Sequence, residues 1–138
     1  MPIAHFHLVR STFTPDQGRR LLVRAAEVYA EVLDSPLERI RTYLAPVEPG
    51  AMTVGGTLVA DGGEPAPYFT AVVLEGRPAA QRAELLRRFT DLLVEILNAS
   101  RPTVRGRIIE VSPDDWGIGG EPASAVRAPV RTGTPPSR

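Results

Sequence analysis

Residues 2–9 read Pro-Ile-Ala-His-Phe-His-Leu-Val, and residues 67–74 read Pro-Tyr-Phe-Thr-Ala-Val-Val-Leu. Each stretch places a proline directly before an apolar, alternating run of the length of a β-strand. The same block therefore occurs twice in one chain of 138 residues. The two heads differ chemically: if Met1 is removed, Pro2 becomes a free secondary amine, whereas Pro67 stays locked in a peptide bond.

Helix signals follow the first block. Thr14 is a typical N-cap residue, and Pro15 and Asp16 suit the first helical turn. Apolar residues then recur at helical spacing, which predicts an amphipathic helix from Pro15 to about Leu33. A second strand is expected at residues 39–45, so the first copy has the order strand, helix, strand.

The second copy repeats this order. Its sequence predicts a strand at residues 68–74, a helix at about 79–98 and a strand at 103–110. The two copies stay in register to the end, because Arg41 and Arg105 take the same place in the second strand of each.

The duplication predicts an α+β fold. Tandem β-α-β repeats, at residues 2–60 and 67–124, would pair their strands into a four-stranded sheet with both helices on one face. We expect residues 1–124 to form one domain and the tail at 125–138 to be flexible. Because the other face of the sheet needs a cover, the chain is expected to associate through it.

The composition excludes several kinds of chemistry. The chain has no cysteine, so disulfides, thiol catalysis and thiolate metal sites are ruled out. It has no lysine, and all sixteen basic side chains are arginines, so any amine chemistry must use the N-terminus. A formal net charge of zero argues against nucleic acid or an anionic membrane as a partner. With no signal pattern and no transmembrane run, a cytoplasmic protein is expected.

Several short motifs fall in register with the repeats. They are the N-terminal proline, the turn Glu75-Gly76-Arg77, the pair Val104-Arg105 and the stretch Trp116-Gly117-Ile118-Gly119-Gly120. Together they resemble the tautomerase superfamily over nearly the whole chain except the tail. The second copy resembles a complete 4-oxalocrotonate tautomerase subunit, and the first resembles the N-terminal half of cis-3-chloroacrylic acid dehalogenase and its fused relatives. The resemblance implies a tautomerase (MIF-like) fold in a homotrimer, with no cofactor and no metal.

The resemblance also implies roles for individual residues. Pro2 matches the catalytic N-terminal proline, which acts as a general base. Arg77, Arg41 and Arg105 match arginines that hold the carboxylate of a small substrate, and Trp116 matches an aromatic wall of the pocket. The physics suits a base, since a terminal amine titrates at about pH 8. Neighbouring arginines and partial burial would each lower the pKa of that amine.

Three further positions complete the expected site. Arg107 lies two residues after the strand arginine of the second copy and so shares its face, which makes it another candidate for the substrate carboxylate. Tyr29 stands mid-helix, near where the dehalogenases carry a histidine, and is a candidate contact to substrate. In the first copy the place of Arg77 falls on Thr12 or Phe13, so only the second copy keeps that arginine.

Two histidines, His5 and His7, share a strand face and suggest a metal pair at first sight. The sequence offers no obvious third ligand, so packed or hydrogen-bonded histidines are favoured. No metal site is therefore expected.

Two departures from the family pattern bear on the chemistry. The hydrolytic dehalogenases use a second arginine and a carboxylate that activates water, but Leu74 and Ile118 occupy those positions here. This favours proton transfer over hydration. The predicted reaction is a 1,3-keto–enol tautomerisation of a small 2-oxo or 2-hydroxy-dienoate carboxylate, with Pro2 as the base.

Two alternative functions stay open at this point. One is a hydratase, lyase or decarboxylase related to cis-3-chloroacrylic acid dehalogenase and acting on a small unsaturated acid. It is favoured if an acidic side chain such as Asp114, Asp115 or Glu121 reaches the pocket. The other is a catalytically inactive oligomeric binding protein, which a retained Met1 would favour because the proline amine would be blocked.

Overall fold

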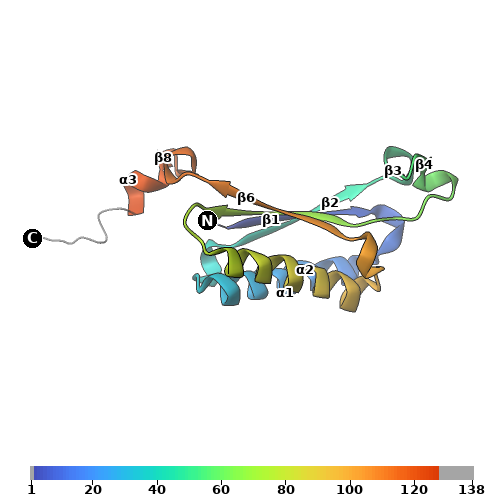
Figure 1. The fold of residues 1–138 in the computed structure, drawn as a ribbon, viewed down its shortest axis with the longest axis horizontal. Coiled ribbons are helices and arrows are strands. Elements are labelled where there is room, and N and C mark those ends of the chain that lie inside the picture. Colours follow the sequence, from blue (N-terminus) through green and yellow to red (C-terminus); the bar gives the residue numbers. More distant parts are fainter. Residues whose placement is uncertain (1, 128–138) are drawn as a thin grey trace, which may run out of the picture.

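The computed structural model describes residues 2–127. Its centre is a four-stranded sheet in the order β2-β1-β5-β6, with the long helices α1 (Pro15–Leu33) and α2 (Ala79–Leu97) on one face (Figure 1). The strands are β1 (Ile3–Val9), β2 (Arg41–Val47), β5 (Tyr68–Leu74) and β6 (Arg105–Val111). This confirms the predicted α+β architecture of two β-α-β repeats. No helix within the described residues is long and apolar enough to cross a membrane.

The strand pairing shows the duplication directly. β2 runs parallel to β1 and β6 runs parallel to β5, while β1 and β5 are antiparallel at the centre of the sheet. Each parallel pair is one repeat and is connected by its own helix. Because the central pair is antiparallel, Ile3 at the start of β1 lies opposite Val72 near the end of β5. Equivalent residues of the two repeats therefore lie toward opposite ends of the sheet.

The core lies between the sheet and the helices and is built on aromatic rings. Phe6 and Phe69, partners across the β1–β5 pair, each contact Phe89 of α2 with ring centroids 5.5 Å apart. Tyr29 of α1 meets Phe89 edge-on at 5.2 Å. Gly106 of β6 leaves room for this cluster, since a Cβ there would lie 2.2 Å from the Phe69 ring. Buried rings of this size are a main source of stability in a small domain.

Both long helices have the ends that the sequence predicts. The Thr14 hydroxyl accepts a hydrogen bond from the Gln17 backbone N–H at 3.1 Å, and the Gln17 side-chain oxygen accepts one from the Thr14 backbone N–H at 2.9 Å. The two bonds form a capping box at the start of α1. Asp34 ends α1 and Asn98 ends α2, each in a left-handed conformation with φ of 51° and 57°. The two helix ends border the cavities described below.

The second strand of each repeat begins two residues later than the sequence predicts. Residues 37–39 and 101–103 form short 3-10 turns, the first after Pro36 and the second around Pro102. Proline favours such a turn because its backbone angle is fixed and it has no N–H to donate to a strand ladder. β2 and β6 therefore start only after these turns.

Each repeat ends in a small hairpin. β3 (Thr53–Val54) pairs with β4 (Thr57–Leu58), and β7 (Gly117–Ile118) pairs with β8 (Glu121–Pro122). Figure 1 shows the hairpin of the second repeat at the end of the sheet where β1 starts, and the hairpin of the first repeat at the opposite end. The second repeat thus sends its hairpin toward the N-terminal proline of the first.

The chain after β8 forms the short helix α3 (Ala123–Arg127), which includes the first three residues of the expected tail. Ala123 is buried and its amide donates to Trp116 O at 2.7 Å, while Ser124 Oγ donates to Asp114 Oδ1 at 2.6 Å. The rest of the expected tail, residues 128–138, lies outside the described residues.

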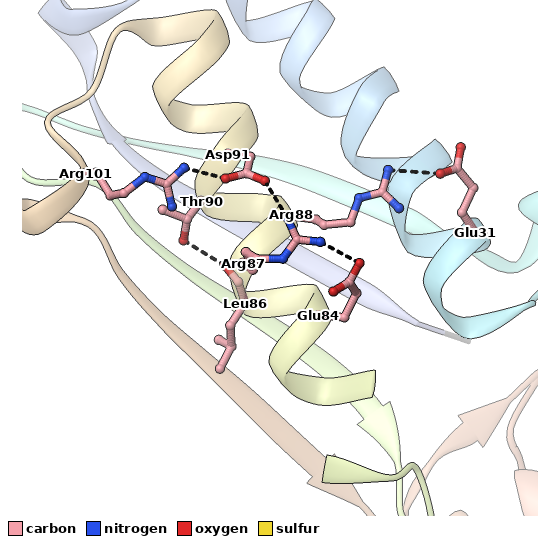
Figure 2. Close-up of polar contacts among 8 residues, drawn as sticks. All are labelled: Glu31, Glu84, Leu86, Arg87, Arg88, Thr90, Asp91 and Arg101. Atoms are coloured by element: carbon pink, nitrogen blue, oxygen red, sulfur yellow. Dashed lines mark hydrogen bonds and ion pairs between the residues drawn. The ribbon is translucent and has the colours of Figure 1, made fainter. Parts of the chain in front are cut away.

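Ion pairs connect α2 to its neighbours (Figure 2). Arg88 reaches Glu31 of α1 at 3.0 Å, and Asp91 pairs with Arg87 at 3.1 Å and also with Arg101 beyond the helix. Since most of these side chains are well exposed, each pair contributes little stability alone. Together they pair Arg87 and Arg88 of α2 with carboxylates of the same chain.

Candidate active site

The same backbone hydrogen bond opens both repeats. The Arg41 amide donates to Pro2 O and the Arg105 amide donates to Pro67 O, each at 3.0 Å. Each proline is thereby fixed beside the start of the second strand of its repeat. The backbone treats the two prolines alike, so any chemical difference between them comes from the side chains around them and from the terminal amine.

Pro2 lines a small cavity of about 60 Å³ at its end of the sheet. The lining residues are Pro2, Leu33, Ser35, Arg39, Val73, Leu74 and Arg77. The end of α1 and the end of β5 meet here, so both repeats contribute. The structure brings the arginine of the second repeat to the proline of the first, in a space of the size of a carboxylate group.

Arg77 is held at the end of α1. Its Nη1 donates to Leu33 O at 2.7 Å and lies 3.4 Å from Gln81 Oε1, and Gln81 Nε2 donates to Val32 O at 2.8 Å. A cation at the last carbonyls of a helix binds acceptors that have no partner inside the helix. Because a guanidinium has five N–H donors, this anchoring through one Nη leaves others to bind a ligand.

A groove of about 420 Å³ adjoins this region. Its lining residues are Ile3, Glu38, Arg39, Arg41, Trp116, Gly117, Ile118 and Gly119. Trp116 reaches it from the hairpin of the second repeat, and Arg41 from β2 of the first. Arg39 lines both the groove and the Pro2 cavity, so the two spaces are neighbours at this residue.

Arg39 is a site residue that the sequence did not predict, and its neighbour Glu38, which lines the groove, is another. Arg39 ends the 3-10 turn Leu37–Arg39, and that turn directs it to the cavity while Arg41 begins β2. The tautomerase motifs do not mark this position. The signal in the sequence was the triplet Arg39-Ile40-Arg41. With a strand expected to begin at residue 39, this triplet placed both arginines on one strand face and gave no sign that Arg39 leaves the strand for a turn beside Pro2.

Arg105 and Arg107 lie away from Pro2 within the chain. Both are on β6, where Arg105 pairs with Tyr68 and Arg107 pairs with Thr70. The Arg105 guanidinium donates to Pro102 O at 2.8 Å in the preceding turn. Arg105 therefore belongs to the end of the sheet that holds the second-repeat proline, and Arg107 to the middle of the open sheet face.

Tyr29 belongs to the core, which corrects its expected contact with substrate. Its side chain is fully buried, and its hydroxyl donates to Val72 O at 2.5 Å with Ile3 O at 3.5 Å. The phenol thus bridges the backbones of β5 and β1. Burial raises the pKa of Tyr29, and the charge of nearby Arg77 opposes that rise only in part, so the phenol stays protonated at neutral pH.

The two histidines pack on the open face of the sheet. His5 stacks on Tyr43 with ring centroids 5.0 Å apart, and His7 stacks on Tyr68 at 5.4 Å. Burial lowers the pKa of His7, and the charge of His5 lowers it further. Across residues 2–127, no three side chains of the His, Cys, Asp or Glu type gather as they would around a metal ion.

Comparison with known proteins assigns the two repeats. The family model described as tautomerase enzyme matches residues 2–62 and matches again over residues 67–125. The chain belongs to the tautomerase family. Pro2 and Pro67 each head one tautomerase unit, so the sequence duplication is a duplication of the family domain.

Similar curated tautomerases are about one repeat long. A 2-hydroxymuconate tautomerase from Pseudomonas sp. (strain CF600) is 38% identical over 61 residues, which cover 44% of this chain and 97% of that protein. A probable tautomerase from Ralstonia nicotianae is 37% identical over 65 residues, covering 47% of this chain and 93% of that protein.

Solved structures share the whole duplicated fold. One described as native fused 4-OT has a TM-score of 0.84 at 24% identity and covers 90% of this chain and 98% of its own. A fused 4-OT described as a symmetric trimer gives 0.81 at 24% identity, covering 89% and 98%. Pt0534, solved after inactivation by 2-oxo-3-pentynoate, gives 0.83 at 21% identity, covering 91% and 98%. Likeness at these identities establishes the tandem-repeat fold.

Proposed function

We propose that this tautomerase-family enzyme isomerises a small 2-oxo or 2-hydroxy-dienoate carboxylate, with Pro2 as general base after removal of Met1. The observation that carries the proposal is the cavity in which Pro2 of the first repeat meets Arg39 and Arg77. Similarity to a 2-hydroxymuconate tautomerase over one repeat supports the class of substrate.

The proposed reaction needs one base that both takes and returns a proton. The Pro2 nitrogen takes the hydroxyl proton of the enol and returns a proton to C3 or to a more distal carbon of the conjugated chain. No atom is gained or lost overall. Positive charges near an amine disfavour its protonated form, which is the direction that a general base needs, and Arg39 and Arg77 line the same cavity as Pro2.

The arginines around the cavity are suited to the substrate carboxylate. A guanidinium binds a carboxylate through two parallel hydrogen bonds, and Arg39 and Arg77 both line the Pro2 cavity. Arg41 and Trp116 line the adjoining groove. In this arrangement the carboxylate is held beside the base, while the conjugated chain extends along the groove against the indole ring.

We further propose that the chain forms a homotrimer through its open sheet face. The fused 4-OT relatives of the same fold are described as trimers. One row across this face consists of Tyr43, His5, Thr70 and Arg107, and Tyr43 is 46% exposed in the single chain. Sedimentation should give about three times the chain mass of 14.9 kDa. A monomer at micromolar concentration would contradict this assembly.

In such a trimer, Arg105 and Arg107 of one chain are candidates for the Pro2 cavity of the next. Mixing chains that carry Pro2→Ala with chains that carry Arg105→Ala tests this for Arg105. If it acts across the interface, mixed trimers contain some sites with both residues intact and recover part of the activity lost in each parent. Full activity of the Arg105→Ala protein alone would remove it from the site.

Covalent labelling tests the base and the carboxylate pocket together. The probe is 2-oxo-3-pentynoate, a 2-oxo acid with an electrophilic alkyne that inactivates Pt0534. We expect intact-mass measurement and peptide mapping to find one label per chain on Pro2, with pyruvate giving protection. Arg77→Ala should slow labelling, while Arg101→Ala, which removes an arginine paired with Asp91 instead, should not. A retained Met1 or a label elsewhere would overturn the proposal and favour an inactive binding protein.

Hydration of an unsaturated acid is a second candidate, and Glu38 favours it. Glu38 lines the same groove as Trp116, and a carboxylate in that groove is a candidate to activate water. The acidic residues considered from the sequence, Asp114, Asp115 and Glu121, line neither the groove nor the Pro2 cavity. Product mass separates the two reactions, since tautomerisation leaves the substrate mass unchanged and hydration adds one water. Glu38→Gln should abolish hydration and spare tautomerisation.

A further inference from the structure

A second cavity lies at the opposite end of the sheet, around Pro67. It has a volume of about 280 Å³, against about 60 Å³ for the Pro2 cavity. The ends of β1 and α2 form its walls, together with residues 64–66 of the segment that joins the repeats. It is distinct from the site described above, because the two cavities share no lining residue.

The two cavities are equivalent places in the two repeats. Each is built around the proline that heads a repeat and beside the last residue of a helix, Leu97 in one and Leu33 in the other. Even the hydrogen bonds to the helix ends correspond: Gln17 Nε2 donates to Ile96 O at 3.1 Å, as Gln81 Nε2 does to a carbonyl of α1. The Pro67 cavity is therefore the counterpart of the proposed active site.

The larger volume has a visible cause. Thr12 stands where the Pro2 cavity has Arg77, and its hydroxyl donates to Val9 O at 2.6 Å, back onto its own turn. The space that the longer side chain fills at one end stays open at the other. Residues 64–66 then add a wall from the joining segment and deepen the hollow.

The electrostatic character has also changed. Among the residues that line the Pro67 cavity, Glu64 is the one with a charged side chain, while Asn98, Ser100 and Thr12 bring neutral polar groups. The remaining lining is apolar. A carboxylate entering this space would lie near the Glu64 carboxylate and meet no cation among the lining residues, which is unfavourable. An uncharged molecule carries no such cost.

We propose that the Pro67 cavity is a non-catalytic binding site for a small uncharged molecule with an apolar body and one hydroxyl or carbonyl group. An apolar cavity of about 150 Å³ admits benzene, so about 280 Å³ fits a substituted ring. Because the nitrogen of Pro67 is part of a peptide bond, this cavity lacks the amine base of the proposed active site, and we expect the occupant to be held unchanged. The inference uses other residues than the proposed tautomerase site and stands apart from it.

A pair of matched probes tests the charge selectivity. p-Cresol and 4-hydroxybenzoate differ by a methyl group against a carboxylate, and each is titrated into the uniformly labelled full chain while amide chemical shifts are recorded. We expect p-cresol to bind saturably with a dissociation constant of ~1 mM or below, shifting the amides of Thr12, Ala99 and Ser100. The carboxylate should leave these amides unshifted at the same concentration.

Two variants locate the binding. Thr12→Arg gives this cavity an arginine at the position equivalent to Arg77. The substitution should weaken p-cresol binding at least about tenfold and allow 4-hydroxybenzoate to bind. Ser11→Arg adds the same charge at an exposed neighbouring position outside the lining and should change neither. Ala99→Leu fills the cavity without adding a charge, so it should weaken p-cresol binding and should not allow 4-hydroxybenzoate to bind. With two variants of different kind, the location can still be tested if one of them does not fold.

Activity separates this inference from the proposed function. Thr12→Arg should leave tautomerase activity unchanged, because Thr12 lines neither the Pro2 cavity nor the adjoining groove. The proposal is overturned if p-cresol gives no saturable shift at these amides, if it shifts only amides around Pro2, or if 4-hydroxybenzoate binds here equally well. A neighbouring subunit that fills the cavity in the assembly would produce the first of these results.

Discussion

The Arg77 guanidinium, which comes from the second repeat, donates a 2.7 Å hydrogen bond to Leu33 O at the end of the helix of the first. The same arginine lines the cavity that holds Pro2. It therefore has a structural contact and a proposed carboxylate contact on one side chain. The two roles predict different consequences of substitution.

Replacing Arg77 separates these roles. Arg77→Lys keeps the charge but loses the planar fork, so we expect KM for a 2-oxo acid to rise at least about tenfold with little change in thermal stability. Gln81→Ala is the matched control, because Gln81 also bonds the end of α1, through Val32 O, without lining the cavity. If Gln81→Ala raises KM as much, the loss is explained by disturbance of the α1 end and of Arg77, which Gln81 Oε1 contacts at 3.4 Å, and the substitution at Arg77 gives no support for a carboxylate contact.

Pro2→Ala tests the base itself. A general base contributes on the order of 10²–10⁴ to the rate, and we expect kcat/KM to fall by at least about 10² with unchanged circular dichroism. Pro67→Ala is the control within the same chain, since it alters the equivalent residue of the other repeat. Equal losses in both variants would show that a proline at a repeat head supports the fold rather than the chemistry.

Tyr29→Phe should cost stability and spare activity. The buried hydroxyl bonds Val72 O, and loss of one such hydrogen bond typically costs about 1 kcal/mol. Urea unfolding measures that loss, and steady-state kinetics at saturating substrate should show kcat within about twofold of the parent. A large fall in kcat with normal stability would return Tyr29 to the candidate site.

His7 predicts a pH dependence of stability. Burial and the charge of His5 lower its pKa below the ordinary value of 6.5, so the unfolded chain binds a proton in a pH range where the folded chain does not. The free energy of unfolding therefore rises with pH between the lowered pKa and 6.5, and falls as acid is added through that window. His7→Gln should flatten this part of the denaturation profile. An unchanged profile would assign the dependence to other groups.

Gly106→Ala should destabilise the core. Its Cβ would lie 2.2 Å from the Phe69 ring, and overpacking of this kind costs about 1–3 kcal/mol. Gly50→Ala is the matched control, because a Cβ there has nothing within 4 Å. Similar melting temperatures for both variants would show that Phe69 moves aside at no cost.

Local signals account for what could be predicted of the fold. Thr14 and Pro15 mark the start of α1 through side-chain and backbone preferences that do not depend on the rest of the molecule. The 3-10 turns before β2 and β6 were not predicted because each is three residues long, which is too short for a helical period to show in the sequence. A proline next to each turn was the clue that went unused.

The candidate site was harder to predict because it depends on topology. Arg41 and Arg105 occupy the same place in their repeats, and nothing in the local sequence says which lies near Pro2. The antiparallel pairing of β1 with β5 decides it, by placing the start of β6 at the other end of the sheet. Arg39 was missed for the related reason that its position depends on a turn whose neighbours are distant in sequence.

The paired hydrogen bonds from Arg41 to Pro2 and from Arg105 to Pro67 carry a consequence for the history of the chain. An unlinked subunit carries every substitution into all the sites that it builds. Here the two prolines keep the same backbone bond, yet Thr12 belongs to one cavity and Arg77 to the other. Because the two repeats are joined but differ in sequence, a substitution can change one cavity and leave the other as it was. Selection can therefore reshape one cavity while the other is held constant.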